Sequence, residues 1–230
     1  MAINNNGQPL NEESFQEITR RLADLASQFY LRGWLLGTSG NLSSVIQFEP
    51  LRVAITASGL HKGRLTSDGF LEIDDSANVL IGVGKPSAES LIHLAVIRAT
   101  GCRAVIHTHS VQSTVLSMRH ADIGRIEISG LEMLKGLENV PSHEHREIIP
   151  IIRNSQDMAL ISRNVSKMLE ENPSIHGFLL SGHGLYTWGS SIEAAGRHVE
   201  VMEFLLDVLL RYETIDPRQD KFKIEKFMVE

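Results

Sequence analysis

Short β-branched runs alternate with amphipathic segments along most of this 230-residue chain. Apolar residues at steps of three and four predict helices, and short apolar runs between turn residues predict strands. We expect helices at 11–30, 85–101, 111–118, 156–169 and 190–209, and strands at 53–55, 70–73, 103–109, 125–129 and 177–180. Because each amphipathic element must bury its apolar face against another, the alternation predicts an α/β fold with helices packed on one sheet.

No repeat or linker divides the chain, so we expect a single domain over 1–230, with its core at about 11–212 and a charged C-terminal segment at 213–230. The helix ends carry their own signals. Asn11 is expected to cap the first helix, and Pro86 to occupy the first turn of the second. Ser190 with Glu193 predicts a capping box at the start of the last helix.

The chain has a formal net charge of -6 and a single cysteine, Cys102. This charge leaves no basic surface for a phosphodiester backbone, so we expect no nucleic-acid partner. One cysteine cannot form an intrachain disulfide, and we expect Cys102 to be a buried small residue. The polar residues 1–10 contain no apolar signal core, and no later run is long enough to cross a bilayer. These features predict a cytoplasmic protein without a membrane partner.

A pair of histidines ends one of the expected strands. His107 and His109 are two residues apart, and alternate strand residues point to the same face, so their imidazoles converge. A zinc ion that keeps one position open for substrate takes about three protein ligands. His183 is the best third candidate, because it follows another buried strand and lies between Gly182 and Gly184, where the backbone can approach closely.

An isolated pair of this spacing is more often two ordinary polar residues at a strand end. The pair His143 and His145 has the same spacing, but it lies in a polar stretch beside Pro141, and we expect a solvated loop there. The other histidines have no partner at ligand spacing and are expected in the core or on the surface: His61, His93, His120, His176 and His198.

Three short polar turns offer hydroxyls and backbone N–H groups to an anion such as phosphate. Their candidate binding residues are Ser39, Gly40, Asn41, Ser58, Gly59 and Ser87. The chain lacks the glycine patterns that bind nucleotides. Two carboxylates follow such turns, Glu89 and Glu132, and each is a candidate acid or base whose role the spacing leaves open.

Five motifs occur in the order typical of one superfamily: Thr38-Ser39-Gly40-Asn41, Thr56-Ala57-Ser58-Gly59, Lys85-Pro86-Ser87-Ala88-Glu89, His107-Thr108-His109-Ser110 and Ser181-Gly182-His183-Gly184. Over roughly 15–211 the chain thereby resembles the class II aldolase and adducin-head superfamily. The resemblance implies a three-layer domain with a central, largely antiparallel sheet flanked by helices. It also implies a homotetramer with active sites near subunit contacts.

Within the superfamily, the segments at 132–136 and 183–189 resemble the branch that dehydrates 5-methylthioribulose 1-phosphate in methionine salvage. That resemblance implies one Zn²⁺ per subunit on His107, His109 and His183, a small phosphorylated ketose held by the three turns, and Glu132 as the catalytic acid or base. Glu89 is similar in position to the catalytic glutamate of the fuculose-phosphate aldolases. Cleavage of a ketose 1-phosphate of the fuculose or rhamnulose type is therefore an alternative. A non-catalytic adducin-like module is a second alternative, against which the three intact histidines argue.

Overall fold

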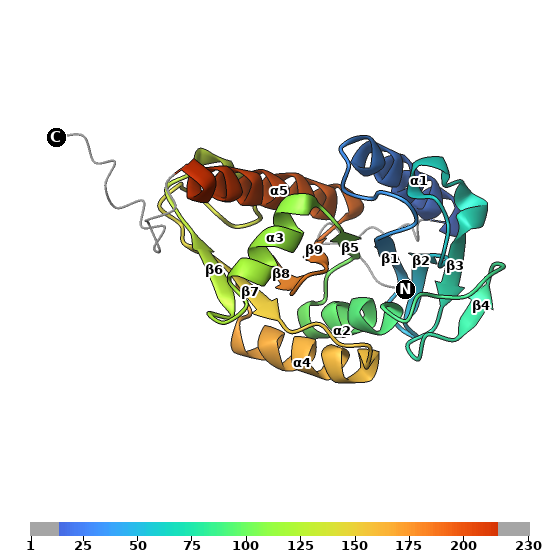
Figure 1. Cartoon of the computed structure of the whole chain (residues 1–230). Coiled ribbons are helices and arrows are strands. Elements are labelled where there is room, and N and C mark those ends of the chain that lie inside the picture. Colours follow the sequence, from blue (N-terminus) through green and yellow to red (C-terminus); the bar gives the residue numbers. More distant parts are fainter. Residues whose placement is uncertain (1–13, 216–230) are drawn as a thin grey trace.

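Nine strands form one sheet at the centre of the computed structural model of the chain, which describes residues 14–215 (Figure 1). Their order across the sheet is β4-β3-β2-β1-β5-β9-β8-β7-β6, and every neighbouring pair is antiparallel except β7 and β8. The strands are β1 (Asn41–Gln47), β2 (Arg52–Thr56), β3 (Phe70–Ile73), β4 (Val79–Ile81), β5 (Ala104–Thr108), β6 (Arg125–Ile128), β7 (Glu147–Ile152), β8 (Gly177–Leu180) and β9 (Gly184–Gly189). The expected α/β fold with a largely antiparallel sheet is confirmed.

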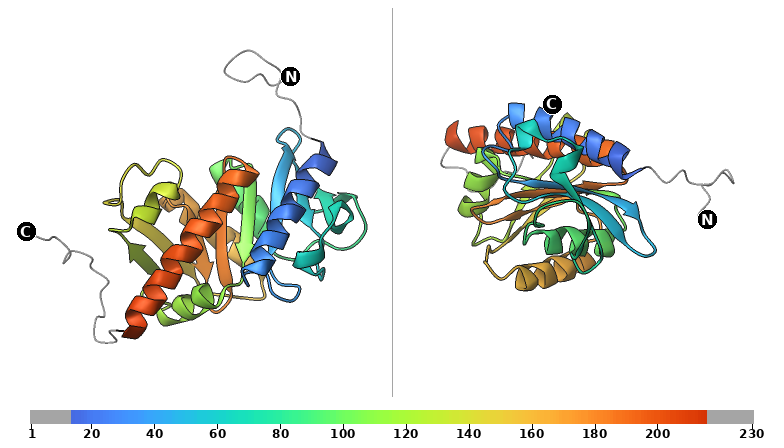
Figure 2. Two further views of the ribbon diagram at one scale, coloured as in Figure 1. Left: turned by 90° about the horizontal axis from the view of Figure 1, so that it is seen from above. Right: turned by 90° about the vertical axis from the view of Figure 1, so that its right-hand side faces the viewer.

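Helices cover both faces of this sheet, which gives three layers (Figure 2). Helices α1 and α5 lie on one face and α2 and α4 on the other, while α3 contacts α5. The helices are α1 (Phe15–Leu31), α2 (Ser90–Thr100), α3 (Val111–Arg119), α4 (Met158–Glu171) and α5 (Ile192–Ile215), with short 3₁₀ turns η1 (Lys62–Arg64), η2 (Ser67–Gly69) and η3 (Glu132–Gly136).

Strand β5 runs through the middle of the sheet, and all of its residues are buried. Val105 belongs to the apolar cluster that contains residues of α2 and α4, whereas Ile106 belongs to the cluster formed with α1 and α5. Because successive strand residues point to opposite faces, His107 shares the face of Val105 and Thr108 that of Ile106. Thr108 accordingly donates its hydroxyl hydrogen bond to Glu203 on α5, at 2.7 Å.

The starts of helices α1, α2 and α5 differ from the sequence predictions. Helix α2 begins at Ser90, because the residues before it pair with the turn that follows β2: the Ser58 N–H donates to the Lys85 carbonyl at 2.9 Å, and Ala57 forms a bridge with Pro86. The predicted helix start at Pro86 was therefore wrong.

At the start of α5, the Ser191 hydroxyl accepts from the Ala194 N–H at 3.1 Å, so Ser191 caps the helix in place of Ser190. Ser190 hydrogen-bonds to Glu138 instead. Helix α1 begins at Phe15, and the Ser14 hydroxyl caps it by accepting from the Glu17 N–H at 3.2 Å, so the predicted cap Asn11 was wrong. Asn11 itself and the segment 216–230 lie outside the described residues.

Strand β7 occupies part of the stretch expected to be a polar loop, and it includes Pro150. Proline lacks the N–H that a ladder needs, and β7 tolerates it next to the short edge strand β6, where Pro150 lies opposite Arg125. Strands β1, β4 and β9 were also not predicted. Within 14–215, no helix combines the length and the apolar character that crossing a membrane requires.

Candidate metal centre and anion pocket

Three imidazoles meet where β5 ends beside the turn between β8 and β9. The Nε2 atoms of His107 and His109 lie 2.8 Å apart, and those of His107 and His183 lie 3.3 Å apart. The three rings have centroids within 4.5–4.9 Å of one another. The structure thus brings together the three histidines that the sequence singled out.

Glycines allow this convergence. A Cβ atom on Gly184 would overlap the carbonyl oxygen of Thr108, so only glycine lets β9 begin this close to β5. Gly182 has a φ of +66°, a left-handed conformation that turns the chain back directly before His183. The histidine therefore projects from a turn whose shape depends on the glycine on either side of it.

The orientation of His107 is fixed on two sides. Its Nδ1–H donates to the Leu185 carbonyl at 2.9 Å, which leaves the Nε2 lone pair facing the other two histidines. Its ring stacks on Tyr186, with centroids 3.9 Å apart and planes within 11°. Burial, with a smaller effect from the neighbouring His107 and His183, lowers the pKa of His109 to about 3, so this imidazole is neutral and able to ligate a metal.

Glu89, the residue directly before α2, adds a carboxylate to the three imidazoles. Its Oε1 lies 3.0 Å from His183 Nε2 and 3.5 Å from His107 Nε2. Burial alone would raise the pKa of Glu89, but its contacts with His107 and His183 hold that pKa well below its usual range. The four ligand atoms all lie within 4.8 Å of one another.

This donor set fits a divalent cation. Tetrahedral ligands at ~2.0–2.1 Å from zinc are about 3.3–3.4 Å apart, and His107 and His183 have that separation, 3.3 Å. The close approach of Nε2 atoms is unfavourable between neutral imidazoles unless a proton or a cation lies between their lone pairs. His107, His109 and His183 are therefore suited to hold the ion, with Glu89 available as a fourth ligand.

Asn41, the first residue of β1, holds Glu89 in place. Its side-chain amide donates to Glu89 Oε2 at 2.5 Å, and its side-chain oxygen accepts from His93 Nε2. His93 in turn bonds the Ser43 hydroxyl through Nδ1 at 2.7 Å, and burial lowers its pKa to about 3. Sequence reasoning treated His93 as core filling, because nothing in its spacing reveals a link to Asn41.

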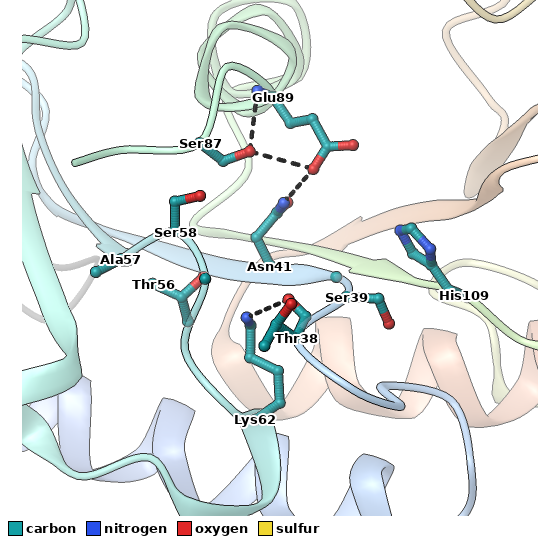
Figure 3. A pocket seen from close by; sticks show the side chains of 12 residues that line it. Thr38, Ser39, Asn41, Thr56, Ala57, Ser58, Lys62, Ser87, Glu89 and His109 are labelled. Atoms are coloured by element: carbon teal, nitrogen blue, oxygen red, sulfur yellow. Dashed lines mark hydrogen bonds between the residues drawn. The ribbon is translucent and has the colours of Figure 1, made fainter. Parts of the chain in front are cut away.

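A pocket of about 100 Å³ opens beside this cluster (Figure 3). All six residues predicted to bind phosphate line it, together with Glu89 and His109: Ser39, Gly40, Asn41, Ser58, Gly59 and Ser87. Gly40 has a φ of +71°, and a Cβ there would lie 2.6 Å from the His107 carbonyl oxygen. The wall of the pocket is thus in direct contact with the strand that carries the histidines.

Glu132, in contrast, lies far from the cluster of its own chain. It follows β6, whose last residue pairs with Glu147 at the start of β7, whereas the turn containing His183 follows the residue that pairs with Ile152 at the end of β7. Its side chain is 71% exposed and forms ion pairs with Lys135 at 3.1 Å and His143 at 3.5 Å. Glu132 and the histidine cluster are therefore at opposite ends of the strands.

A second group, His145, Glu147 and His176, lies at the same end of the strands as Glu132, where β7 and β8 begin. The buried Glu147 accepts from His145 Nε2 at 2.8 Å and from His176 Nδ1 at 2.9 Å. His176 Nε2 also donates to the Glu138 carbonyl at 2.8 Å. These contacts are ordinary N–H···O hydrogen bonds, unlike the N···N contacts at the first cluster. His145 lies in a loop, as expected, with a side chain that is 29% exposed. The spacing in the sequence did not reveal that His145 and His176 share the carboxylate of Glu147.

The chain is similar to known proteins over most of its length. The family described as Class II Aldolase and Adducin N-terminal domain matches residues 20–210. A curated methylthioribulose-1-phosphate dehydratase from Pseudomonas fluorescens is 38% identical over 205 residues, which cover 89% of this chain and 97% of that protein. A dehydratase of the same name from Sorangium cellulosum is 38% identical over 86% of this chain and 93% of its own length. A solved L-fuculose 1-phosphate aldolase is similar in fold, with a TM-score of 0.74 at 20% identity over 90% of this chain and 91% of that one.

Proposed function

The chain belongs to the class II aldolase and adducin N-terminal domain family, and we propose that it dehydrates 5-methylthio-D-ribulose 1-phosphate to 2,3-diketo-5-methylthiopentyl 1-phosphate in methionine salvage. It is a hydro-lyase, a methylthioribulose-1-phosphate dehydratase. The observation that carries this function is the 38% identity, over almost their whole length, to curated relatives with this activity. The intact cluster of His107, His109, His183 and Glu89 agrees with it.

The resident ion is proposed to be Zn²⁺, one per subunit, because neutral imidazoles and a carboxylate are ligands that zinc favours. His107, His109 and His183 would hold it. A divalent cation at this place supplies Lewis acidity, which stabilises negative charge on a substrate oxygen. The neutral state of His109 and the fixed ring of His107 prepare the chain for this role.

Substrate orientation follows from the shape of the site. The phosphate occupies the pocket formed by the turns around Ser39, Ser58 and Ser87, where hydroxyl and backbone N–H groups can donate to it. His109 and Glu89 line the same pocket, so the carbon chain extends from the phosphate toward the cluster. Dehydration then removes a proton from C3 and the hydroxyl group from C4, and the resulting enol becomes the diketone. The reaction needs a group that takes the first proton and one that protonates the departing hydroxyl.

Two carboxylates are proposed for these proton transfers. Glu89 lies at the cluster of its own chain, 3.0 Å from His183. Glu132 is exposed at the opposite end of the strands, and we propose that it acts at the cluster of a neighbouring copy in a homotetramer. Each active site would then combine His107, His109, His183 and Glu89 of one subunit with Glu132 of another.

The central test is elemental analysis of the purified protein, combined with an assay of the same sample on methylthioribulose 1-phosphate. The proposal expects about one zinc per subunit and a diketone that retains every carbon atom of the substrate.

The position of Glu89 at the histidine cluster is also compatible with the alternative function, that of an aldolase. A retro-aldol reaction would instead break the C3–C4 bond and release a triose phosphate, and detection of that fragment would replace the dehydratase with the aldolase. A protein that binds no metal would favour a non-catalytic module.

The shared site is tested by subunit mixing. Glu132→Gln and His183→Ala proteins should each be nearly inactive, while coassembled mixtures regain activity. Sites that combine histidines from the first variant with Glu132 from the second are intact, and an equal mixture contains about a quarter of such sites. If mixed oligomers form but stay inactive, Glu132 does not act across subunits. Full turnover by Glu132→Gln with zinc bound would remove Glu132 from the reaction altogether.

A further inference from the structure

Lys62 in η1 places a buried ammonium at the wall of the anion pocket. Its side chain is only 1% exposed, and it is among the residues that line the pocket. The Nζ atom donates to the carbonyl oxygens of Thr38 at 3.0 Å and Leu60 at 2.9 Å (Figure 3 shows the first contact). Because an ammonium has three N–H donors, these two bonds leave one donor for a further acceptor.

The charge of Lys62 has no direct counterion in the part of the chain from 14 to 215, where no carboxylate oxygen lies within 4.0 Å of Nζ. Burial lowers its pKa to about 8, and the nearby charge of Glu89 opposes this effect only in part. A buried cation that is bonded only to neutral carbonyls is costly unless an anion joins it. The pocket beside it is the place from which such an anion can approach.

The position of Lys62 is fixed by the packing of α1. The next residue, Gly63, lies against the ring of Tyr30, and a Cβ on Gly63 would be only 2.6 Å from the Tyr30 Cγ atom. Tyr30 also packs on His61, with ring centroids 4.6 Å apart. The residues on both sides of Lys62 are therefore held by one aromatic ring. This packing directs the lysine inward at a fixed place, as a built binding site requires.

We propose that Lys62 binds the phosphate group of the substrate and makes the pocket selective for phosphorylated over unphosphorylated ketoses. The proposal rests on the proposed function only in that the substrate is a phosphate monoester. The hydroxyl groups of Ser39, Ser58 and Ser87 are neutral donors, whereas Lys62 supplies the full positive charge that a dianion favours. Lys62 carried no motif in the sequence. Its role becomes visible only when η1, the turn after β2 and the turn before β1 are seen to share one pocket.

The test uses the zinc-loaded protein and inorganic phosphate as the probe. The Lys62→Gln change removes the charge and keeps a donor for the two carbonyls. Protection against thermal unfolding by phosphate should then require about 10- to 100-fold more anion, the loss of one charge-assisted hydrogen bond. The control Lys167→Gln removes an equal charge at an exposed site on α4 and should leave phosphate affinity unchanged. With substrate, the Lys62→Gln protein should show a raised KM and a smaller change in kcat.

Wild-type phosphate affinity in a folded, zinc-replete Lys62→Gln protein would overturn the proposal. Should this variant not fold, a crystal structure of the wild-type protein with phosphate decides the question: the anion must lie within hydrogen-bond distance of Nζ, and an anion held elsewhere in the pocket contradicts the assignment. The two measurements with inorganic phosphate, thermal protection and the crystal structure, do not depend on the reaction. A wild-type protein that binds phosphate through Lys62 but does not turn over methylthioribulose 1-phosphate would sink the proposed function alone.

Discussion

His107 Nε2 lies 3.3 Å from His183 Nε2, although 76 residues separate the two histidines in the chain. The contact depends on the pairing of β5 with β9, in which His107 lies opposite Tyr186. Ligands that the fold brings together from distant segments make metal binding and folding mutually dependent, because the unfolded chain does not offer the same site. The metal should therefore stabilise the whole sheet as well as support the reaction.

The first prediction concerns this coupling. His183→Ala removes one of the three imidazoles, so we expect sub-stoichiometric zinc and almost no activity. In the wild-type protein, zinc at a thousandfold excess over its Kd should raise the unfolding free energy by about 4 kcal/mol, and most of this increase should disappear in the variant. Calorimetry with and without a chelator measures the effect. The control His143→Ala, which removes an exposed imidazole, should keep the full zinc response.

The second prediction concerns Asn41, whose amide donates to Glu89. Asn41→Asp keeps the shape but places a second carboxylate beside Glu89, and two adjacent carboxylates repel when both are ionised. The substitution also replaces the amide oxygen that accepts from His93 Nε2 with a charged carboxylate oxygen. We expect a loss of about 10- to 100-fold in kcat, with Glu89 displaced from the cluster. Steady-state kinetics and zinc titration check this, and the exposed Asn164→Asp serves as the control for added charge. Unchanged kcat would show that Asn41 does not position Glu89.

The third prediction concerns the pair of Glu147 and His176. Both His176 nitrogens face acceptors, the Glu147 carboxylate and the Glu138 carbonyl, so the ring needs both protons and is charged. Burial disfavours the charged forms of Glu147 and His176, and by itself would raise the pKa of Glu147 and lower that of His176. The hydrogen bond between Glu147 and His176 nevertheless holds the pKa of Glu147 below its ordinary value of 4.5 and that of His176 above 6.5. The Glu147 contribution to stability is lost as pH falls through its lowered pKa, and the His176 contribution as pH rises through its raised pKa.

Glu147→Gln should therefore destabilise the protein most between about pH 4.5 and 6.5, where both groups are charged. The difference in melting temperature from the wild-type protein should shrink by pH 9. Thermal unfolding at several pH values measures it, with Glu171→Gln on the exposed face of α4 as the control. A difference that stays constant from pH 5 to 9 would mean that the pair contributes through packing and not through charge.

Much of this molecule follows from local sequence patterns. The stripe of α1 predicts burial of Ile18, Leu22 and Phe29, and all three are buried. The strand that carries His107 was likewise visible as an apolar run, and the turn around His183 as an apolar run followed by glycines. Strand β7 was not, because Pro150 within it and the polar stretch from Pro141 to Arg146 before it imitate a loop, and only the neighbouring strands reveal the pairing.

The sequence predicts those site residues whose type and spacing are both typical of a binding site. It does not predict residues that join the site only because the folded chain brings distant segments together. Two histidines at alternate strand positions, together with a third in a glycine-flanked turn, indicate a metal from the amino-acid sequence alone. His93 and Lys62 have no such spacing: the first reaches Asn41 from a helix 52 residues away, and the second joins a pocket made by three separate turns. Glu132 shows a further limit, since its distance from His183 appears only in the strand order of the whole sheet.

The last prediction concerns Glu203, which α5 places beneath β5, the strand that carries His107. Its carboxylate accepts from Thr108 Oγ1 at 2.7 Å and from Gln112 Nε2 at 3.0 Å. Burial nevertheless raises its pKa to about 7 from the ordinary 4.5. For an acid with a raised pKa, the folded state favours the protonated form. Stability is therefore full below pH 4.5 and falls as pH rises through 7.

Glu203→Gln resembles the protonated carboxyl group in shape and charge, so we expect it to be nearly neutral at pH 5 and to raise the melting temperature above that of the wild-type protein at pH 8. Urea unfolding at the two pH values gives the same comparison as a free energy. The exposed Glu170→Gln should show no such dependence on pH. A lower stability of Glu203→Gln at pH 8 would show that the hydrogen bonds from Thr108 and Gln112 outweigh the cost of burying the charge. Glu203 would then stabilise the end of β5 as a carboxylate.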